Sequence, residues 1–342
     1  MLTPLATAVL IALKKILPPQ YNPALKNHLV KGTVTFSTKE VAFDKIKKGR
    51  KLAPLVSPMV GGKPQKTKAS KMVSVEPAYV KPTDVVTSDR IMVRQPGENL
   101  MGDQTPAQRL NVVRADILLE HDESIDRREE WMIAEVLKTG AVTLEAEGFE
   151  TLHVDFGRSP ENNVTLSGSD KWSVLDKNTS QKPMDDIEDW SSRCNIVADY
   201  VCMGRDAWRQ FRQFKCVKDV LDTRRGSKSE LELGPMNNAH YQWVGTIGSM
   251  DIFVYIGAYE DDTGADQLYV DANGVMVTGK SIELYMGYGG IQDVKANAQG
   301  IVAATRYPSN WYQDNPSVEM IQTQSAPVPI LLDADEVCYA RV

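Results

Sequence analysis

One short stretch of the sequence has residues that could bind a nucleotide. Residues 274–281, GVMVTGKS, fit the phosphate-loop pattern G-x-x-x-x-G-K-[ST], and the run ILLDAD at 330–335 ends in acids that could hold magnesium. A phosphate loop must open a helix, because free N–H groups at the helix N-terminus hold the phosphates. Gly287, Gly289 and Gly290 follow too closely for a good helix, and the loop interior is apolar and mostly β-branched. The sequence therefore predicts a strand between two turns, with a nucleotide-dependent enzyme as the alternative.

No other combination of residues singles out an active site. The triplet DFG at 155–157 lacks the glycine-rich loop and the H-R-D sequence of a kinase, so it indicates a strand that ends at a glycine. The four histidines are scattered, and none has a second His or Cys at ligand spacing. We therefore expect no catalytic residue, no cofactor and no metal.

Charge is divided unevenly along the chain. The net charge is -6, which argues against a protein whose main task is to grip nucleic acid. Residues 1–100 hold 17 Lys and Arg against 6 Asp and Glu, a surplus of +11, so the remaining residues carry -17. The basic end could lie on an acidic neighbour or face a polyanion, or it could be a solvated, flexible arm.

The cysteines and the apolar N-terminus indicate neither disulfides nor a membrane anchor. The four cysteines contain no C-x-x-C pair and are expected to be reduced, as in a protein made in the cytoplasm: Cys194, Cys202, Cys216 and Cys338. The apolar run at 5–13 is too short to span a bilayer, and its lysines follow the run, whereas those of a secretory signal precede it.

The first hundred residues predict segments that need cover from outside. Residues 3–41 mix prolines with short apolar clusters, which indicates an extended arm lying on a neighbour. Between residues 49 and 97, β-favouring runs such as MVSVEPAYV and IMVRQ flank a turn at 61–64, GGKP. We expect a long projecting hairpin there, and a disordered linker is the alternative.

A long helix is predicted from residue 105 to residue 140. Thr105 is the expected N-cap, Pro106 the first helical residue and Gln108 the capping-box partner, while Gly140 ends the helix. Apolar residues keep a helical spacing, and the acids, Glu129 among them, are assigned to the opposite faces. The helix would be roughly 50 Å long, unless a break at 121–124 divides it.

The rest of the chain predicts a mixed α+β fold. AVTLEA and TLHVDF, on either side of residues 147–148, form a hairpin pattern. Helices are expected at 185–194 and 204–222 with a buried strand at 196–203 between them. Further strands of an antiparallel sheet are expected later in the chain, at 246–259, 266–270, 274–279 and 318–342.

Several longer motifs resemble one family of proteins. They occur in the family's order from about residue 50 to the C-terminus: YVKP at 79–82, DFGR at 155–158 with ENN at 161–163 and Trp172, LDTRRGS at 221–227 with SEL at 229–231, GIQD at 290–293, RYP at 306–308, Trp311 and QSAP at 324–327. In these motifs the sequence resembles the major capsid proteins of lambda-type tailed phages.

The resemblance implies the Hong Kong 97 type capsid fold and a division of the chain into five parts. These are an N-terminal arm at 1–45, an extended E-loop at 46–102, a peripheral domain with a spine helix and hairpin at 103–160, an axial domain at 161–310, and C-terminal strands at 311–342 that return to the peripheral domain. Contact with other subunits is expected from the E-loop residues Gly61, Gly62, Lys63, Lys66, Lys68 and Lys71. The family motifs contribute Arg158, Asn162, Asn163, Asp222, Arg224 and Arg225.

The implied function is assembly of an icosahedral phage head from pentamers and hexamers around double-stranded DNA, without sequence-specific contact to that DNA. Implied partners are other copies of the chain, a head decoration protein, a scaffold and a portal. A nanocompartment shell protein of the same fold is the nearest alternative.

Overall fold

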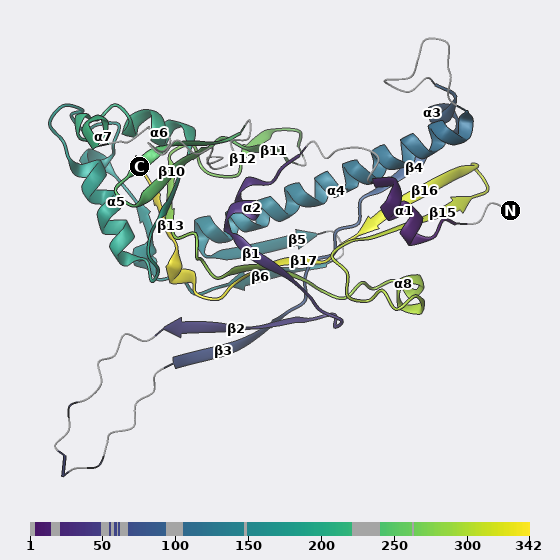
Figure 1. The fold of residues 1–342 in the computed structure, drawn as a ribbon, viewed down its shortest axis with the longest axis horizontal. Helices are drawn as coiled ribbons and strands as arrows, with labels where there is room; N and C mark the ends of the chain where they lie inside the picture. The colour runs from purple at the N-terminus through teal and green to yellow at the C-terminus, as the bar shows by residue number, and fades with distance from the viewer. Residues whose placement is uncertain are drawn as a thin grey trace, which may run out of the picture.

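The computed structural model describes residues 4–14, 21–48, 55, 58–59, 61, 68–93, 105–146, 149–220, 240–261 and 263–342. A single long helix, α4 (Pro106–Thr139), runs along the molecule, with a compact sheet domain at one end and a smaller sheet at the other (Figure 1). The fold is of the mixed α+β class, as predicted.

The predicted ends of α4 are confirmed. The Thr105 hydroxyl accepts a hydrogen bond from the Gln108 amide, and the Gln108 side chain accepts one from the Thr105 amide, which completes a capping box. Gly140 ends the helix in the left-handed conformation, at φ 79°. The helix continues without a break through 121–124. Glu129, predicted to lie on a face opposite the apolar residues, is fully buried, as is its neighbour Glu130.

A six-stranded sheet forms the core of the domain at the far end of α4. Its order is β7-β18-β13-β8-β10-β9, and helices pack beside it (Figure 1). The sheet is mixed and not antiparallel throughout, since β8 runs parallel to β10 and β7 parallel to β18. Its elements are β7 (Asn163–Thr165), α5 (Lys182–Arg193), β8 (Tyr200–Met203), α6 (Arg205–Phe211), α7 (Lys215–Val220), β9 (Tyr241–Ile247), β10 (Met250–Tyr255), β13 (Gly274–Thr278) and β18 (Cys338–Arg341).

Three predicted elements of this domain have different limits. The single helix expected at 204–222 is two helices, α6 and α7, because the chain turns at 212–214 and buries Phe211 and Phe214. The strand expected at 246–259 is divided by a turn at Gly248, whose φ of 62° suits glycine. The strand expected from residue 196 begins only at Tyr200.

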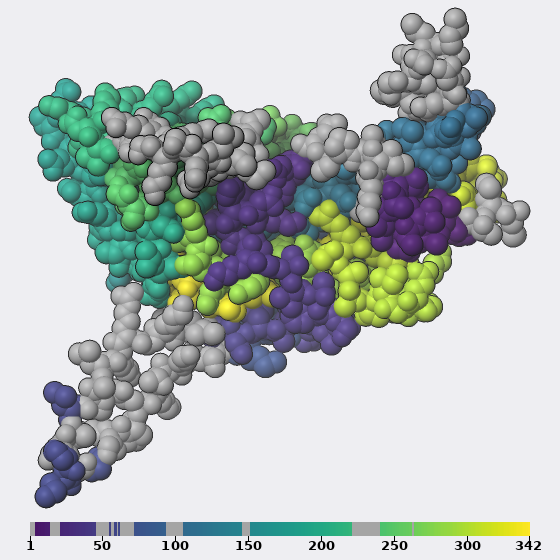
Figure 2. Space-filling model, in the orientation of Figure 1, coloured from purple at the N-terminus to yellow at the C-terminus, as the bar shows by residue number. Residues whose placement is uncertain are grey.

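The N-terminal segment packs on its own chain, so the extended conformation expected for the arm is wrong for the described residues, while its contact with a neighbour stays a prediction. The helix α1 (Thr7–Lys14) packs on α4 through Leu10, and α2 (Ala24–Leu29) packs on it through Leu25 and Leu29. The strand β1 (Val30–Thr35) then pairs in parallel with β14 (Leu284–Tyr288), which also pairs with β17 (Pro327–Leu331). Figure 2 shows these residues in purple across the middle and one end of the visible face.

The terminal strands are shared among three sheets. β15 (Tyr307–Gln313) and β16 (Val318–Gln324) form a sheet with β4 (Thr83–Val86) beside α4, β17 joins β14, and β18 enters the six-stranded sheet. The run IMVRQ, expected as a strand, begins inside the short helix α3 (Ser88–Met92). The last α-helix in the described part of the chain is α8 (Val294–Ala298).

Three further pairs of strands each form a two-stranded sheet. They are β2 (Val41–Lys48) with β3 (Lys68–Val75), β5 (Ala141–Ala146) with β6 (Phe149–Asp155), and β11 (Ala258–Glu260) with β12 (Asp266–Leu268). The hairpin pattern predicted after α4 is confirmed by β5 and β6. No helix in the described part of the chain is long and apolar enough to cross a bilayer.

Candidate assembly site and buried motif residues

The β2–β3 pair leaves the body of the molecule, and the contacts of its described side chains with the rest of the chain lie near its base (Figure 1). Val41 and Val75, directly opposite each other, are buried, and Phe43 stacks on Phe156 with ring centroids 5.9 Å apart. Farther out, Met72 keeps 70% of its surface exposed. A two-stranded ribbon with one anchored end gains little stability from its own chain, so its outer part is available to another molecule.

The expected contact residues of the E-loop are described in part. Gly61 is exposed, while Gly62, Lys63 and Lys66 lie outside the described residues. The backbone of Lys68 and Lys71 belongs to β3, where the register places Lys68 opposite Lys48 and Lys71 opposite Lys45.

Arg158, one of the family-motif residues, holds the C-terminal end of α4. Its guanidinium donates hydrogen bonds to the carbonyl oxygens of Val136 (2.9 Å), Leu137 (3.0 Å) and Lys138 (3.1 Å) in the last turn of the helix, where the Val136 oxygen also accepts from the amide of the C-cap Gly140. Burial lowers the pKa of Arg158 to about 10. A buried arginine in this position neutralises the negative end of the helix dipole.

The neighbouring motif residues connect the end of α4 to the C-terminal part of the chain. The Asn163 side chain accepts a hydrogen bond from Arg158 and donates one to the Thr139 carbonyl. Asn162 donates to the Asp335 carboxylate at 3.1 Å. Asp335 also accepts from the amide and hydroxyl of Ser159. Asp335, which ends the run considered for magnesium binding, is therefore part of this hydrogen-bond network. The motif residues Asp222, Arg224 and Arg225 lie outside the described residues.

The phosphate-loop match has the predicted strand geometry. Residues 274–278 form the buried strand β13, and after a turn the chain enters β14 without a helix. The Lys280 amide, which would face a phosphate, donates to the Asp199 carboxylate at 2.7 Å, and the Lys280 ammonium pairs with Asp251. A methyl group at Gly279 would lie 2.4 Å from the Val197 carbonyl oxygen. The protein itself occupies the space and the donors that a phosphate would need.

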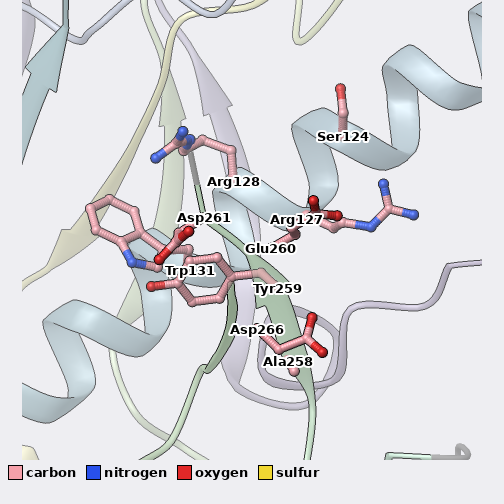
Figure 3. Close-up of a pocket in the computed structure, with 9 residues that line it drawn as sticks. All are labelled: Ser124, Arg127, Arg128, Trp131, Ala258, Tyr259, Glu260, Asp261 and Asp266. Carbon is pink, nitrogen blue, oxygen red and sulfur yellow. The ribbon is translucent and has the colours of Figure 1, made fainter. Parts of the chain in front are cut away.

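An open pocket of about 550 Å³ lies between α4 and the β11–β12 pair (Figure 3). Ser124 donates its hydroxyl hydrogen to the His121 carbonyl, and the Arg128 guanidinium lies 5.3 Å from the Trp131 ring centre. Asp261 accepts hydrogen bonds within its own turn, chiefly from Thr263, and these lower the pKa of its carboxyl to about 2. The polar groups of Ser124, Arg128 and Asp261 are thus committed to local structure.

Other residues that could do chemistry are separate or buried. Among the described residues, no three His, Cys, Asp or Glu side chains could together hold a metal ion. All four cysteines are free thiols, and burial raises the pKa of each: Cys194 to about 11, Cys202 and Cys338 to about 12, and Cys216 also above its usual value.

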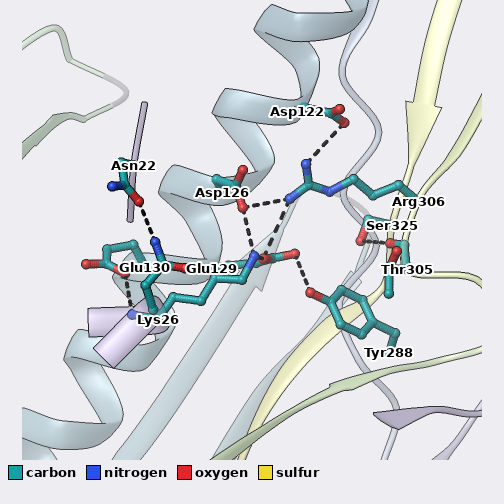
Figure 4. A network of polar contacts seen from close by, with 11 residues as sticks. Asn22, Lys26, Asp122, Asp126, Glu129, Glu130, Tyr288, Thr305, Arg306 and Ser325 are labelled. Atoms are coloured by element: carbon teal, nitrogen blue, oxygen red, sulfur yellow. Dashed lines mark hydrogen bonds and ion pairs between the residues drawn. The ribbon is translucent and has the colours of Figure 1, made fainter. Parts of the chain in front are cut away.

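A cluster of buried charges on α4 was not predicted from the sequence. Lys26 and Arg306 meet Asp126 and Glu129 in the interior, although Lys26 and Arg306 are 280 residues apart in the sequence (Figure 4). The one available signal was the arginine in the motif RYP at 306–308. Hydrophobic periodicity assigns every acid to a polar face, so it cannot identify acids whose counter-ions come from distant segments.

The described residues thus form an α+β fold with a long central helix, a compact sheet domain at one end, a second sheet at the opposite end and an outward two-stranded ribbon.

Comparison with known proteins identifies the family. Residues 6–342 match the model of the family described as phage major capsid protein E, and the chain belongs to this family. It is 32% identical to the major capsid protein of Escherichia phage lambda, covering 93% of each chain. It is 34% identical to the P21 prophage-derived major head protein of Escherichia coli O6:H1, covering 91% of each, and 34% identical to the phage N15 major capsid protein, covering 93% of each.

Solved structures agree with this placement. A crystal structure assigned to a prophage capsid protein of Escherichia coli CFT073 superposes with a TM-score of 0.81 at 25% identity over the whole of both chains. The capsid of cyanophage P-SCSP1u shares the fold at a TM-score of 0.50 and 9% identity, covering 95% of this chain and 90% of that one. The predicted resemblance to lambda-type major capsid proteins is confirmed, and the chain is a shell-forming protein of the phage head.

Proposed function

We propose that the chain assembles into pentamers and hexamers of an icosahedral phage head that encloses double-stranded DNA. The observation that carries this proposal is the family match from residue 6 to residue 342. The β2–β3 pair supports it, since a ribbon anchored at one end can reach a neighbouring subunit. Many moderate interfaces of about 1,000 Å² or more each add up over a closed shell to high stability.

Within this shell we assign the Hong Kong 97 type parts to the ranges predicted above. The arm is 1–45, the E-loop 46–102 and the peripheral domain 103–160 with α4 as its spine. The axial domain is 161–310, with the six-stranded sheet at its centre, and the C-terminal strands are 311–342. The distribution of those last strands over three sheets supports a role in joining the two domains.

The E-loop lysines contact an acidic surface of an adjacent subunit. The uneven charge, +11 in residues 1–100 against -17 in the rest, supports this contact. Charge reversal at Lys63, Lys66, Lys68 and Lys71 should lower the yield of shells, while the matched reversal of Lys31, exposed on β1, should not. Unchanged yield and stability of the four-lysine variant would overturn the contact.

The proposed partners are those that the family resemblance implies. They are other copies of this chain, a head decoration protein, a scaffold, a portal and packaged DNA without sequence-specific contact. Assembly takes place in the host cytoplasm, without a cofactor or a membrane, and the chain does not act as an enzyme. An ATP-binding titration with Lys280→Ala as control tests the last point, because binding that this substitution abolishes would restore the nucleotide alternative.

Electron microscopy of the purified protein is the direct test of the proposed function. Icosahedral shells or particles of the size of a pentamer or hexamer are expected. A chain that stays monomeric at high concentration would contradict it. Shells that enclose a cargo enzyme in place of DNA would support the nanocompartment alternative.

A further inference from the structure

Four carboxylates lie along one side of the middle of α4, where α2 and the segment before β15 cover them (Figure 4). They are Asp122, Asp126, Glu129 and Glu130. Acids spaced three or four residues apart on a helix repel one another, and burial makes that repulsion stronger. The middle of α4 therefore depends on positive groups from elsewhere in the chain.

Two cations from opposite ends of the sequence bind the same two oxygen atoms. Asp126 Oδ1 lies 2.8 Å from the Lys26 ammonium and 2.8 Å from the Arg306 guanidinium. Glu129 Oε2 lies 2.5 Å from Lys26 and 3.7 Å from Arg306. Arg306 alone reaches Asp122, at 3.1 Å. Lys26 and Arg306 thus share Asp126 and Glu129, whereas Asp122 pairs with Arg306 alone.

The fourth carboxylate attaches the backbone of the N-terminal segment. Glu130 accepts hydrogen bonds from the amides of Leu25 (2.7 Å) and Lys26 (3.0 Å) and from the Tyr255 hydroxyl (2.9 Å). These amides belong to the first turn of α2 and have no partner within that helix. The N-terminal segment is thus held to α4 mainly by carboxylates of the helix and by Leu25 and Leu29 beneath it.

We propose that residues 21–35 form a strap over α4 whose closure depends on Arg306. Loss of either cation leaves buried carboxylates with too little positive charge, and a buried uncompensated charge is strongly destabilising. The strap covers Glu129 and Glu130, the two fully buried carboxylates, with one short helix, so its opening would let water reach them. The N-terminal segment and the β15–β16 sheet are thereby coupled through Asp126 and Glu129.

The coupling acts in both directions, because a coupling free energy between two sites is reciprocal. Opening of the strap weakens the attachment of Arg306, and loss of Arg306 opens the strap. This inference rests on the contacts within one chain and stands whether or not the chain forms pentamers and hexamers.

Amide hydrogen exchange of the full-length chain, followed by mass spectrometry, tests the strap. Lys26→Met should accelerate exchange in residues 24–36 by about tenfold or more, because it breaks a buried ion pair. The distinguishing variant is Arg306→Met, which touches no strap atom and should also accelerate exchange in 24–36. The β13 strand provides the internal reference, where no change is expected.

Two further variants keep the test decisive. Lys31→Met, an equivalent change at an exposed lysine of the same segment, should leave exchange unchanged. Glu129→Gln removes a shared charge and should accelerate exchange in 24–36 and 305–313 together, and it replaces Arg306→Met if that variant fails to fold. The coupling would be overturned if Arg306→Met accelerated exchange in 301–313 alone, or if Glu129→Gln accelerated it in 24–36 alone.

Discussion

The six-stranded sheet and the β2–β3 pair are both built from strands, but they are covered in different ways. In the sheet, every residue of β8 and β13 is buried, and Trp172, Phe211 and Phe214 close the core from the helical side. Among the described side chains of β2 and β3, Val41, Phe43 and Val75 near the base are buried, and Met72 is exposed. The first region is stable by its own packing, whereas the second has surface to offer to a partner. Substitutions in the first should change the free energy of unfolding, and substitutions in the second should change assembly.

The largest effect is expected inside the sheet domain. Trp172 is fully buried, stacks on Trp190 at a centroid distance of 6.0 Å and donates to Asp186 at 2.9 Å. Trp172→Ala should lower the free energy of unfolding by about 3 to 5 kcal/mol, measured by urea denaturation. Val174→Ala, at an exposed position two residues on, should change it by less than about 0.5 kcal/mol. Similar values for the two variants would show that this region is not a self-sufficient core.

A comparable effect is expected where α4 is joined to the sheet domain. Arg158→Ala removes the donors to three helix carbonyls and leaves Asp335 without a nearby cation, so a loss of about 3 kcal/mol is expected in the same measurement. Arg158→Lys keeps the charge but not the fork of donors and should recover only part of that loss. Full recovery would mean that charge alone matters at this position.

A smaller effect, dependent on pH, is expected where β4 meets α4. His121 is buried, with Nε2 3.0 Å from Asp84 and Nδ1 3.2 Å from the Thr323 hydroxyl. Burial lowers the pKa of His121, against the opposing effect of Asp84, Glu120 and Asp122. Below pH 6.5 the unfolded chain takes up a proton that the folded chain resists, so stability falls as the pH falls through this range.

His121→Gln should therefore remove part of the loss of stability between pH 7 and pH 5. At pH 7 the variant should cost about 1 kcal/mol, the usual contribution of one hydrogen bond. Urea denaturation at several pH values measures both effects, with His153→Gln, at an exposed position, as the control. If the wild type and His121→Gln lose stability in parallel as the pH falls, this histidine does not cause the dependence.

The smallest effect on stability is expected on the ribbon. Met72→Ala should change the free energy of unfolding by less than about 0.5 kcal/mol, because the side chain is 70% exposed. The yield of shells in an assembly assay should nevertheless fall. Met92→Ala, an exposed methionine of α3, is the matched change outside the ribbon. Normal yield from the Met72 variant would remove this part of β3 from the assembly surface.

Local signals in the sequence determined the elements whose cause lies within a few residues. Thr105, Gln108 and Gly140 fixed the ends of α4, because caps act through neighbouring backbone groups. The glycines after residue 281 excluded a helix and therefore a phosphate loop. The alternating pattern after α4 predicted β5 and β6, and the family resemblance predicted the class of protein.

Only the tertiary structure decided which distant segments meet. The apolar clusters of α1 and α2 contained too little surface to form a core alone, but α4 supplies the other half, so the expected external arm is bound internally. Glu129 and Glu130 have the same side-chain chemistry as exposed acids, and their burial depends on Lys26, Arg306 and Tyr288 from three other segments. Charge pairing and packing act between groups that are distant in the chain, so neither the partners of these acids nor the strength of the contacts could be predicted from local sequence.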